Sequence, residues 1–336
     1  MFDSAPDNAL RQLQLRHGGG LALKHLVDAG IDVLPQPGGG QTLARWRVLA
    51  DVAAHDLSLA KLFEGHTDAL AILAELDRAS LATAGSLWGT WCAEPPDARL
   101  ALHAAQGGRI RLTGTKAWCS GAATVTHAVV SCWNTANEPC LAAVAMDQPG
   151  VQVTGDGWHA VGMAASASVD VRFDHADATA IGRPGDYVNR AGFWQGGAGI
   201  AACWFGGAHD IAHAVHRLRG PAPDAHRLAH LGAIDVALTA AAAQLREAAA
   251  WIDRHPRDNA RRIALRARLS VEQAANEVLH HAGRAVGAGP LCRDPRFARA
   301  MADLPVFLRQ SHAERDLAAL GQFAANDKEE PSSWTL

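Results

Sequence analysis

Apolar residues recur at helical spacing along the first quarter of the chain. Leu43, Trp46 and Leu49 open a pattern that continues to Leu76 with the period of a helix burying one face. Thr42 is the N-cap that this pattern predicts, and Asp56 and Gly65 are its expected interruptions. Upstream, runs of glycine and proline leave room only for a short helix over 21–29. The pattern predicts a helical N-terminal domain over residues 1–84.

Between residues 85 and 182 the period changes to two. Short apolar or β-branched runs alternate with glycine, proline and asparagine clusters, which are typical of turns. Their even spacing favours a compact antiparallel barrel or sandwich over βαβ units. The expected strands are Leu100–Ala104, Arg109–Thr113, His127–Trp133, Leu141–Met146, Val151–Val153 and Val169–Phe173.

After residue 183 the helical period returns and continues to residue 326. Four segments with short connections predict a four-helix bundle, followed by a mobile tail over 327–336. Asp224 and Asp258 stand where helix N-caps are expected, and Pro305 should kink the last helix. The expected helices are 186–218, 224–254, 258–286 and 295–320.

Composition removes several classes of function. The chain has 336 residues and a net charge of -3, without the basic field that nucleic acid or an anionic membrane surface attracts. Its six cysteines form no C-x-x-C pair and the N-terminus lacks a secretory signal, so a cytoplasmic protein is expected. The uncharged stretch 191–208 is interpreted as a buried helix with close neighbours, because its glycines lower its hydrophobicity.

Four segments across residues 85–190 carry a more specific pattern. Residues 112–121, Leu-Thr-Gly-Thr-Lys-Ala-Trp-Cys-Ser-Gly, are similar to the L-x-G-x-K-x-W-(I/C)-(T/S)-(N/G) pattern of the acyl-CoA dehydrogenases. Residues 91–95, Trp-Cys-Ala-Glu-Pro, resemble the family's T-E-P strand. Residues 161–173 resemble its G-M-R-x-S-x-T-x-x-V-x-F strand pair, and 181–185 resemble the entry to its bundle. The chain is therefore identified as a shortened, divergent member of the acyl-CoA dehydrogenase superfamily.

The resemblance implies an α+β fold with a helical N-terminal domain, a middle β-barrel and a C-terminal four-helix bundle, and it implies FAD as the cofactor. A reduced flavin needs hydrogen-bond donors at the ring edge and a flat apolar wall against one face. Trp118 would supply the wall and Ser120 a hydroxyl. The backbone around Cys92 and Ala93, next to Trp91, would line the other side of the ring.

Two departures from the family pattern affect ligand binding. The threonine that precedes Glu-Pro in the family is Ala93 here, which removes a hydroxyl contact to flavin. The G-x-G-S-D loop that helps hold flavin pyrophosphate and acyl-CoA is replaced by Pro96-Asp-Ala-Arg99. Binding of CoA is therefore expected to be weaker than in the family. The resemblance still implies a small-molecule substrate of the acyl-CoA type.

The catalytic glutamate of the family is absent from both of its usual positions. There is no Y-E-G-T segment, and the first bundle helix holds no glutamate. Residues 307–317 instead resemble the R-x-x-R-D and histidine-bearing ends of flavin monooxygenases in the same superfamily. His312 is the expected proton donor or acceptor, because histidine titrates near neutral pH, and Glu314 is the nearest carboxylate. On a helix, Arg309 and Asp316 would flank His312 on one face.

The resemblance also implies a homodimer or homotetramer, since family members contribute to the flavin site of a neighbouring subunit. The segments for this role are reduced here to Arg217-Leu-Arg-Gly220 and to a glycine-rich run with Gly287 and Gly289. Two alternatives stay open. One is a flavin-free binding or scaffold subunit; the other is a di-iron bundle built on Asp210-Ile-Ala-His213 and Glu277-Val-Leu-His280. Within the flavoprotein reading, an FAD-dependent acyl-CoA dehydrogenase-type oxidoreductase is expected, with a flavin monooxygenase-like enzyme of the same fold as its alternative. The favoured reading needs no metal.

Overall fold

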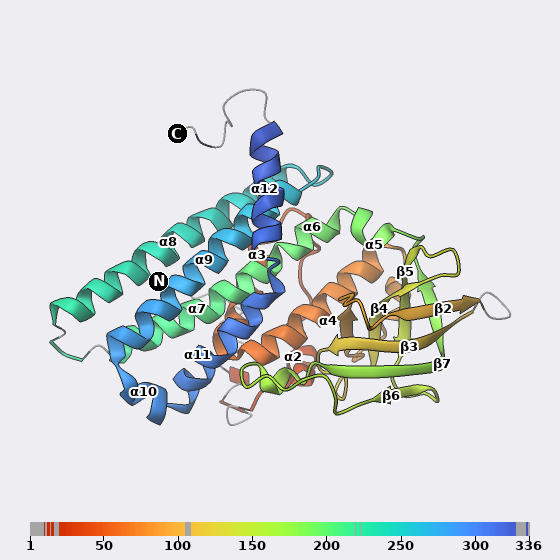
Figure 1. Cartoon of the computed structure of the whole chain (residues 1–336), viewed down its shortest axis with the longest axis horizontal. Coiled ribbons are helices and arrows are strands. Elements are labelled where there is room, and N and C mark those ends of the chain that lie inside the picture. Colours follow the sequence, from red (N-terminus) through yellow and green to blue (C-terminus); the bar gives the residue numbers. More distant parts are fainter. Residues whose placement is uncertain are drawn as a thin grey trace.

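The computed structural model describes residues 20–104, 109–218, 220–222 and 224–326, together with Leu10, Gln12, Leu13, Leu15, Arg16 and Trp334. The predicted tail over 327–336 thus lies almost wholly outside the described residues. Helices gather on one side of the molecule and strands on the other, and helix α4 (Leu57–Glu75) lies between them (Figure 1). The helical part and the strand part of the molecule therefore meet along α4.

The N-terminal helices follow the predicted pattern with two corrections. Helix α2 is Leu23–Asp28 and α3 is Thr42–His55, so Thr42 opens α3 instead of capping it; its hydroxyl donates to Asp253 at 2.5 Å. Asp56 does end α3, and its carboxylate caps α4 by accepting from the Leu59 amide. Gly65 does not interrupt α4. Its carbonyl instead accepts from the Thr90 hydroxyl at 2.7 Å, which seats the first strand on the helix.

The strands form a small closed barrel. Its ring runs β4-β2-β3-β7-β5 and back to β4, with β1 beside β4 and β6 beside β7. The prediction of a wholly antiparallel barrel is wrong, because β4 pairs in parallel with both β1 and β2. The strands are β1 Trp88–Trp91, β2 Leu100–Ala104, β3 Ile110–Cys119, β4 His127–Trp133, β5 Pro139–Ala145, β6 Val151–Val153 and β7 Val169–Ile181.

Strands β3 and β7 are much longer than their apolar runs predicted. They pair with each other from Ile110 to Cys119 through two register shifts, one of them at Gly114. A Cβ at Gly114 would lie 2.5 Å from the Arg99 carbonyl oxygen, so only glycine fits there. Gly114 and Lys116 interrupt the apolar alternation of β3, which is why the sequence pattern ended the strand early.

The C-terminal helices pack as a bundle that also includes a helix of the N-terminal region. Helices α7, α8 and α9 pack on one another, α11 packs on α7, and α3 packs against both α7 and α8. Asp224 caps α8 as predicted, through the Arg227 amide, whereas α9 begins three residues after Asp258. The helices are α5 Asp186–Asn189, α6 Gly192–Gly197, α7 Gly199–Leu218, α8 Ala225–Arg254, α9 Arg261–Val286, α10 Ala288–Arg293, α11 Pro295–Phe307 and α12 Glu314–Asn326.

The prediction of one helix over 295–320 is wrong. Helix α11 contains Pro305 and ends two residues later, at Phe307. A 3₁₀ turn over Leu308–Gln310 follows, and α12 starts only at Glu314. Proline lacks the amide that would donate to the preceding turn, which weakens the helix at its C-terminal end. The chain therefore bends at residues 311–313, which the helical period could not reveal.

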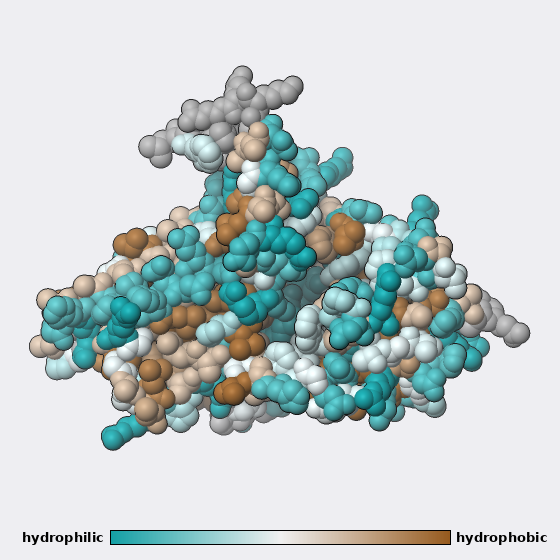
Figure 2. All heavy atoms as spheres, in the orientation of Figure 1, coloured by the Kyte–Doolittle hydropathy of each residue, from teal (hydrophilic) through white to brown (hydrophobic). Residues whose placement is uncertain are grey.

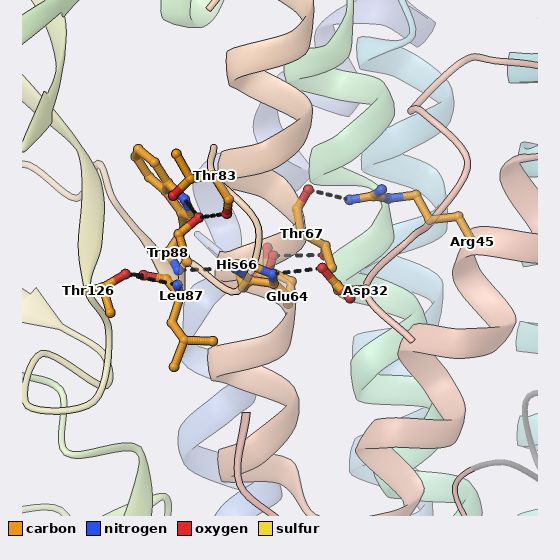
Figure 3. A network of polar contacts seen from close by, with 10 residues as sticks. Asp32, Arg45, Glu64, His66, Thr67, Thr83, Leu87, Trp88 and Thr126 are labelled. Carbon is orange, nitrogen blue, oxygen red and sulfur yellow. Dashed lines mark hydrogen bonds and ion pairs between the residues drawn. The ribbon is translucent and has the colours of Figure 1, made fainter. Parts of the chain in front are cut away.

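A buried imidazole joins the N-terminal segment, α4 and the barrel (Figure 3). His66 Nδ1 accepts from the Trp88 amide at 3.1 Å, so this nitrogen carries no proton. His66 Nε2 lies 3.3 Å from Asp32 and serves as the donor. One residue later, the Thr67 carbonyl accepts from Arg45 of α3 at 3.1 Å. The start of β1 is thus fixed to α4 by a tautomer-specific contact.

One described helix, α8, is long and apolar enough to span a membrane by length and composition. Most of its apolar stretch is not buried within this chain, and Leu228 and Val236 are among its exposed side chains. Asp235 lies near the middle of the exposed stretch. The helix therefore presents an apolar surface that carries charge.

Candidate functional site

A buried ion pair joins the two strand segments that resemble the family patterns. Lys116 Nζ lies 2.7 Å from Glu94 Oε1 and 2.6 Å from the Ser131 hydroxyl, and Lys116 has no solvent exposure. Trp133 Nε1 donates to the other Glu94 oxygen at 3.0 Å. Burial alone would raise the pKa of Glu94, but hydrogen bonds from Lys116, Ser131 and Trp133 hold that pKa below its ordinary value. This clamp sets the position of β3 relative to the Glu-Pro segment.

Trp118 lies at the end of β3 in a left-handed backbone conformation with φ of 57°. Its side chain is 52% exposed, although Ala117 and Cys119 on either side are buried. Such a conformation costs a non-glycine residue on the order of 1–2 kcal/mol, so the surroundings must impose it. They do so at Gly121, whose amide donates to the Ser166 carbonyl at 2.8 Å. The turn thus holds a large apolar ring toward solvent.

The other predicted cofactor residues of the barrel lie around this turn. The Ser120 hydroxyl is 2.8 Å from that of Ser168, and the Ser120 carbonyl accepts from Trp91 Nε1 at 3.1 Å. Trp91 is buried, while Cys92 and Ala93 follow β1 and are partly buried. Trp91, Trp118 and Ser120 are therefore brought together, with the Ser120 hydroxyl already engaged by a serine.

The loop after β6 fastens the same turn to the helices. Asp303 of α11 accepts from the Met163 amide at 2.5 Å, and the Met163 carbonyl accepts from Trp158 Nε1 at 3.1 Å. A Cβ on Gly162 would lie 1.9 Å from the Ala302 carbonyl oxygen, so α11 and the loop touch backbone to backbone. Burial raises the pKa of Asp303. The loop that carries Ser166 and Ser168 is thereby pinned to the bundle.

A cavity of about 260 Å³ lies beside α4 and the bend between α11 and α12. The space-filling view shows the surface hollowed where the start of α12 approaches the β domain (Figure 2). Its lining combines carboxylates, arginines and aromatic rings. The lining residues are Glu64, Asp68, Tyr187, Arg190, Phe193, Trp194, Gly196, Gly197, Ile200, Arg268, Gln310, His312 and Asp316. We call it the α4 pocket.

The bend brings His312 to the α4 pocket but leaves Glu314 outside its lining. His312 Nδ1 lies 3.5 Å from Asp316 Oδ1, and the His312 amide donates to the same carboxylate at 3.2 Å. The imidazole is 57% exposed, so it stands at the mouth of the pocket. Arg309 does not flank it as predicted, because its guanidinium pairs with Glu272 at 2.8 Å. Glu314 is exposed at the start of α12.

Arg268 of α9 ties the bend to the opposite wall of the pocket. Its two terminal nitrogens donate to the Gly197 and Gln310 carbonyls, each at 3.0 Å. The guanidinium also lies over the Trp204 ring. Both terminal nitrogens thus bond to backbone that shapes the pocket.

Asp68 is a carboxylate of the pocket lining with few polar contacts to the rest of the chain. Among the residues that the structure describes, no side chain or amide donates to its carboxylate, and Arg190 Nη2 lies 3.9 Å away. Burial raises the pKa of Asp68, and the charge of Glu64 raises it further, while Arg190 opposes the shift. Apolar spacing over 42–76 did not single out Asp68; the available indication was the pair Glu64 and Asp68, four residues apart on an apolar helix.

Arg217, Gly287 and Gly289 lie elsewhere. Arg217 is in the last turn of α7, Gly287 caps α9 with φ of 71°, and Gly289 is in α10. All three are exposed, at the end of the bundle away from the barrel (Figure 1). Among the described residues none of the three lines the turn at Trp118, so a role at a flavin site would need a second subunit.

The di-iron alternative finds no support in the described parts of the chain. No group of three or more histidine, cysteine, aspartate or glutamate side chains there is placed to hold a metal ion. Asp210 pairs instead with Arg296 at 2.7 Å, and Glu277 pairs with His281 at 3.4 Å. The carboxylate-histidine pairs of the bundle are therefore spread over separate contacts.

Comparison with known proteins identifies the fold. No family model matches the sequence, and no curated protein matches it either. Among solved structures, the FMN-bound dibenzothiophene monooxygenase TdsC from Paenibacillus sp. A11-2 superposes with a TM-score of 0.81 at 18% identity over 97% of both chains. The methanesulfinate monooxygenase MsuC from Pseudomonas fluorescens gives a TM-score of 0.81 at 19% identity over 98% of both chains.

A third similar structure is KijD3 in complex with FMN and a dTDP-linked amino keto sugar. It has a TM-score of 0.79 at 20% identity and covers 100% of this chain and 98% of its own. These proteins have the acyl-CoA dehydrogenase-like fold, and so does this chain, as its sequence patterns predicted. At such identities the likeness establishes the architecture of the molecule.

Proposed function

We propose that this chain is a flavin-dependent oxidoreductase of the monooxygenase type, with its flavin ring against Trp118 and its substrate in the α4 pocket. The observation that carries the proposal is Trp118 itself: a strained turn keeps a large ring half exposed between two buried residues. Strain of this kind persists where the surroundings over-determine it, and it clusters at ligand sites. A flat aromatic ligand is what such a wall would accept.

Several features of the chain fit a flavin and favour FMN over FAD. Trp118 offers the ring wall, and the segment after Glu94-Pro95 offers no pyrophosphate loop. Arg99, in place of that loop, lies over the Trp133 ring with its guanidinium carbon 3.4 Å from the centroid. Arg99 is thus engaged by the tryptophan that also donates to Glu94. FMN is also the flavin named in the structures of TdsC and KijD3.

The α4 pocket argues against an acyl-CoA substrate. A saturated acyl chain there would desolvate Glu64, Asp68 and Arg190 without hydrogen-bonding to any of them, which is costly for charged groups. Neither usual position of the dehydrogenase base holds a glutamate: Glu314 is exposed and outside the lining, and Glu64, which does line the pocket, pairs with Lys61 at 3.0 Å. The monooxygenase alternative is therefore the better supported reading of the sequence.

The residues of the bend can handle a proton. Bound reduced flavin would supply the electrons that activate O₂ for transfer of one oxygen atom. The His312 amide is fixed by Asp316, whose Oδ1 also lies 3.5 Å from Nδ1, so Nε2 is the ring nitrogen left to take or give a proton. Arg268 fixes the backbone of the same bend through Gln310. His312 is thus a positioned acid or base at the pocket mouth.

We expect the purified chain to bind FMN more tightly than FAD. Released cofactor identified by chromatography, and titration of the apoprotein with each flavin by calorimetry, check this. Replacing Trp118 by glycine should weaken FMN binding about 10-fold to 100-fold, since stacking on an aromatic side chain is worth ~1–3 kcal/mol. A chain that binds neither flavin would contradict the proposal and favour the scaffold alternative.

The same variant provides its own control for folding. Glycine adopts positive φ without strain, and Trp118 is half exposed, so Trp118→Gly should melt at or above the wild-type temperature. Loss of flavin affinity without loss of stability is the pattern of a binding residue. A parallel loss of both would mean that the indole is part of the core.

We also propose that the apolar face of α8 is covered by a second copy of this chain. Lipid is disfavoured because Asp235 would be costly in a bilayer, and an exposed apolar helix face of this length usually marks an interface. Light scattering should show a dimer or tetramer, and Val236→Glu should reduce the mass toward that of one chain. A monomeric wild-type protein would exclude this arrangement.

A further inference from the structure

We infer that Asp68 is the anchor of the substrate site and that the ligand of the α4 pocket is a compact aromatic molecule carrying a primary ammonium group. This inference rests on the proposed function only in assigning the pocket to the substrate. The pocket, its carboxylate and its aromatic wall belong to the chain whether or not a flavin is bound.

The charged side chains of the pocket differ in the hydrogen bonds that they already make within the chain. Both terminal nitrogens of Arg268 donate to backbone carbonyls, and Arg190 Nη1 donates to Glu75 at 2.8 Å. The Asp68 carboxylate accepts no hydrogen bond from the part of the chain that the structure describes. Its side chain is 19% exposed in the pocket, so water reaches it in the free protein. A ligand that displaces this water must supply a hydrogen-bond donor in its place.

Arg190 lies beside the carboxylate, with its Nη2 3.9 Å from Asp68. Arg190 is 4% exposed, and its Nε is buried without a hydrogen-bond partner among the described residues. The pocket therefore offers an acceptor, at Asp68, with the positively charged Arg190 guanidinium beside it. A ligand that carries an ammonium group and a nearby carbonyl or hydroxyl oxygen would satisfy both.

The remaining wall determines the body of the ligand. Phe193 makes edge contacts with both Tyr187 and Trp194, each with ring centroids 5.2 Å apart, which gives a continuous aromatic surface. Such surfaces accept planar rings and cations next to them. A cavity of about 260 Å³ is just below the ~300–1,000 Å³ typical of sites for drug-sized ligands, so the ligand is small.

Three probes on one scaffold test the inference on the full chain as purified. Phenylalaninamide carries the ammonium and a carbonyl, 2-phenylethylamine the ammonium alone, and 3-phenylpropionamide the carbonyl alone. Calorimetry should rank their affinities in that order. The ammonium should be worth about 10-fold to 100-fold, as expected for a hydrogen bond to a charged group. Preference for the neutral amide would overturn the inference and make Arg190 the anchor.

Asp68→Asn should abolish the preference for the ammonium probes and leave the affinity for 3-phenylpropionamide within about threefold. Asn is close to isosteric and removes a charge that burial disfavours, so the variant should fold. Asp28→Asn is the matched control, since Asp28 pairs with Lys24 on an exposed face. An unchanged preference in Asp68→Asn would also sink the inference. Flavin binding is measured by absorbance in the same samples. A failure of this inference can therefore be told apart from a failure of the proposed function.

Discussion

Replacing Gly162 by alanine is expected to lower the free energy of unfolding by about 3 kcal/mol, the upper end of the usual cost of overpacking. The added Cβ would lie 1.9 Å from the Ala302 carbonyl oxygen and 3.0 Å from a Val306 methyl carbon. The first of these is helix backbone and cannot rotate away. Either the loop leaves α11 or α11 moves, and both break the hydrogen bond between the Met163 amide and Asp303. Chemical denaturation measures the loss.

The variant should also bind FMN more weakly than wild type while it is still folded, because the loop supplies Ser166, whose carbonyl accepts from Gly121 of the Trp118 turn. Gly155→Ala is the matched control. It lies in the same connection between strands, and a Cβ there would meet nothing within 4 Å. A change of less than ~0.5 kcal/mol is expected for it, as for most surface substitutions. Equal losses in the two variants would show that the contact with α11 is unimportant.

Replacing Lys116 by methionine is expected to destabilise the protein by roughly 3 kcal/mol, the lower end for breaking a buried ion pair by removing one partner. The lower end applies because Glu94 is 29% exposed and keeps contact with water. Methionine preserves most of the volume, so the loss reports on the charge and its hydrogen bonds. Lys24→Met removes the exposed pair with Asp28 and should cost less than ~1 kcal/mol. Similar losses for the two lysines would contradict the buried clamp.

The same variant should respond differently to acid. The pKa of Glu94 in the folded protein lies below its ordinary value of 4.5. The clamp therefore contributes its full stability above about pH 4.5, and this contribution disappears as the pH falls through the lower pKa of the folded state. Denaturation curves between pH 3 and 7 should show a shallower decline for Lys116→Met than for wild type, because the cation that lowers the pKa is gone.

The sequence predicted the barrel better than the bend that completes the candidate site. The alternation of apolar and polar residues predicted β2, β4 and β6 well, because a strand with one buried face places an apolar residue at every second position. It could not find the far half of β3, where Gly114 is required by the Arg99 carbonyl and Lys116 by Glu94. Both reasons are tertiary contacts between distant segments. They appear in the sequence only as interruptions of a pattern.

The periodicity of the sequence could not predict the α4 pocket, for a related reason. Asp68 lies in α4, Arg190 directly after α5 and Arg268 in α9, and no local spacing links residues so far apart. His312 was found because its segment resembles a known pattern. The predicted contact between His312 and Arg309 is wrong, because it assumed one continuous helix, whereas α11 ends at Phe307 and Ala313 is left-handed. Family patterns thus located the wall and the histidine, whereas the polar end of the pocket needed the fold.

The left-handed backbone at residue 118 restricts which side chains can ever form the wall at this turn. Valine, isoleucine and threonine are strongly disfavoured at positive φ, while asparagine, aspartate, histidine and glycine are the residues that tolerate it. Redesign of the wall therefore has few conservative steps available. Histidine would retain a ring with the backbone unchanged, whereas an aliphatic wall of similar bulk would have to displace Gly121 and the loop at Ser166 with it. The conformation of one residue thus limits the chemistry that this surface can acquire by single substitutions.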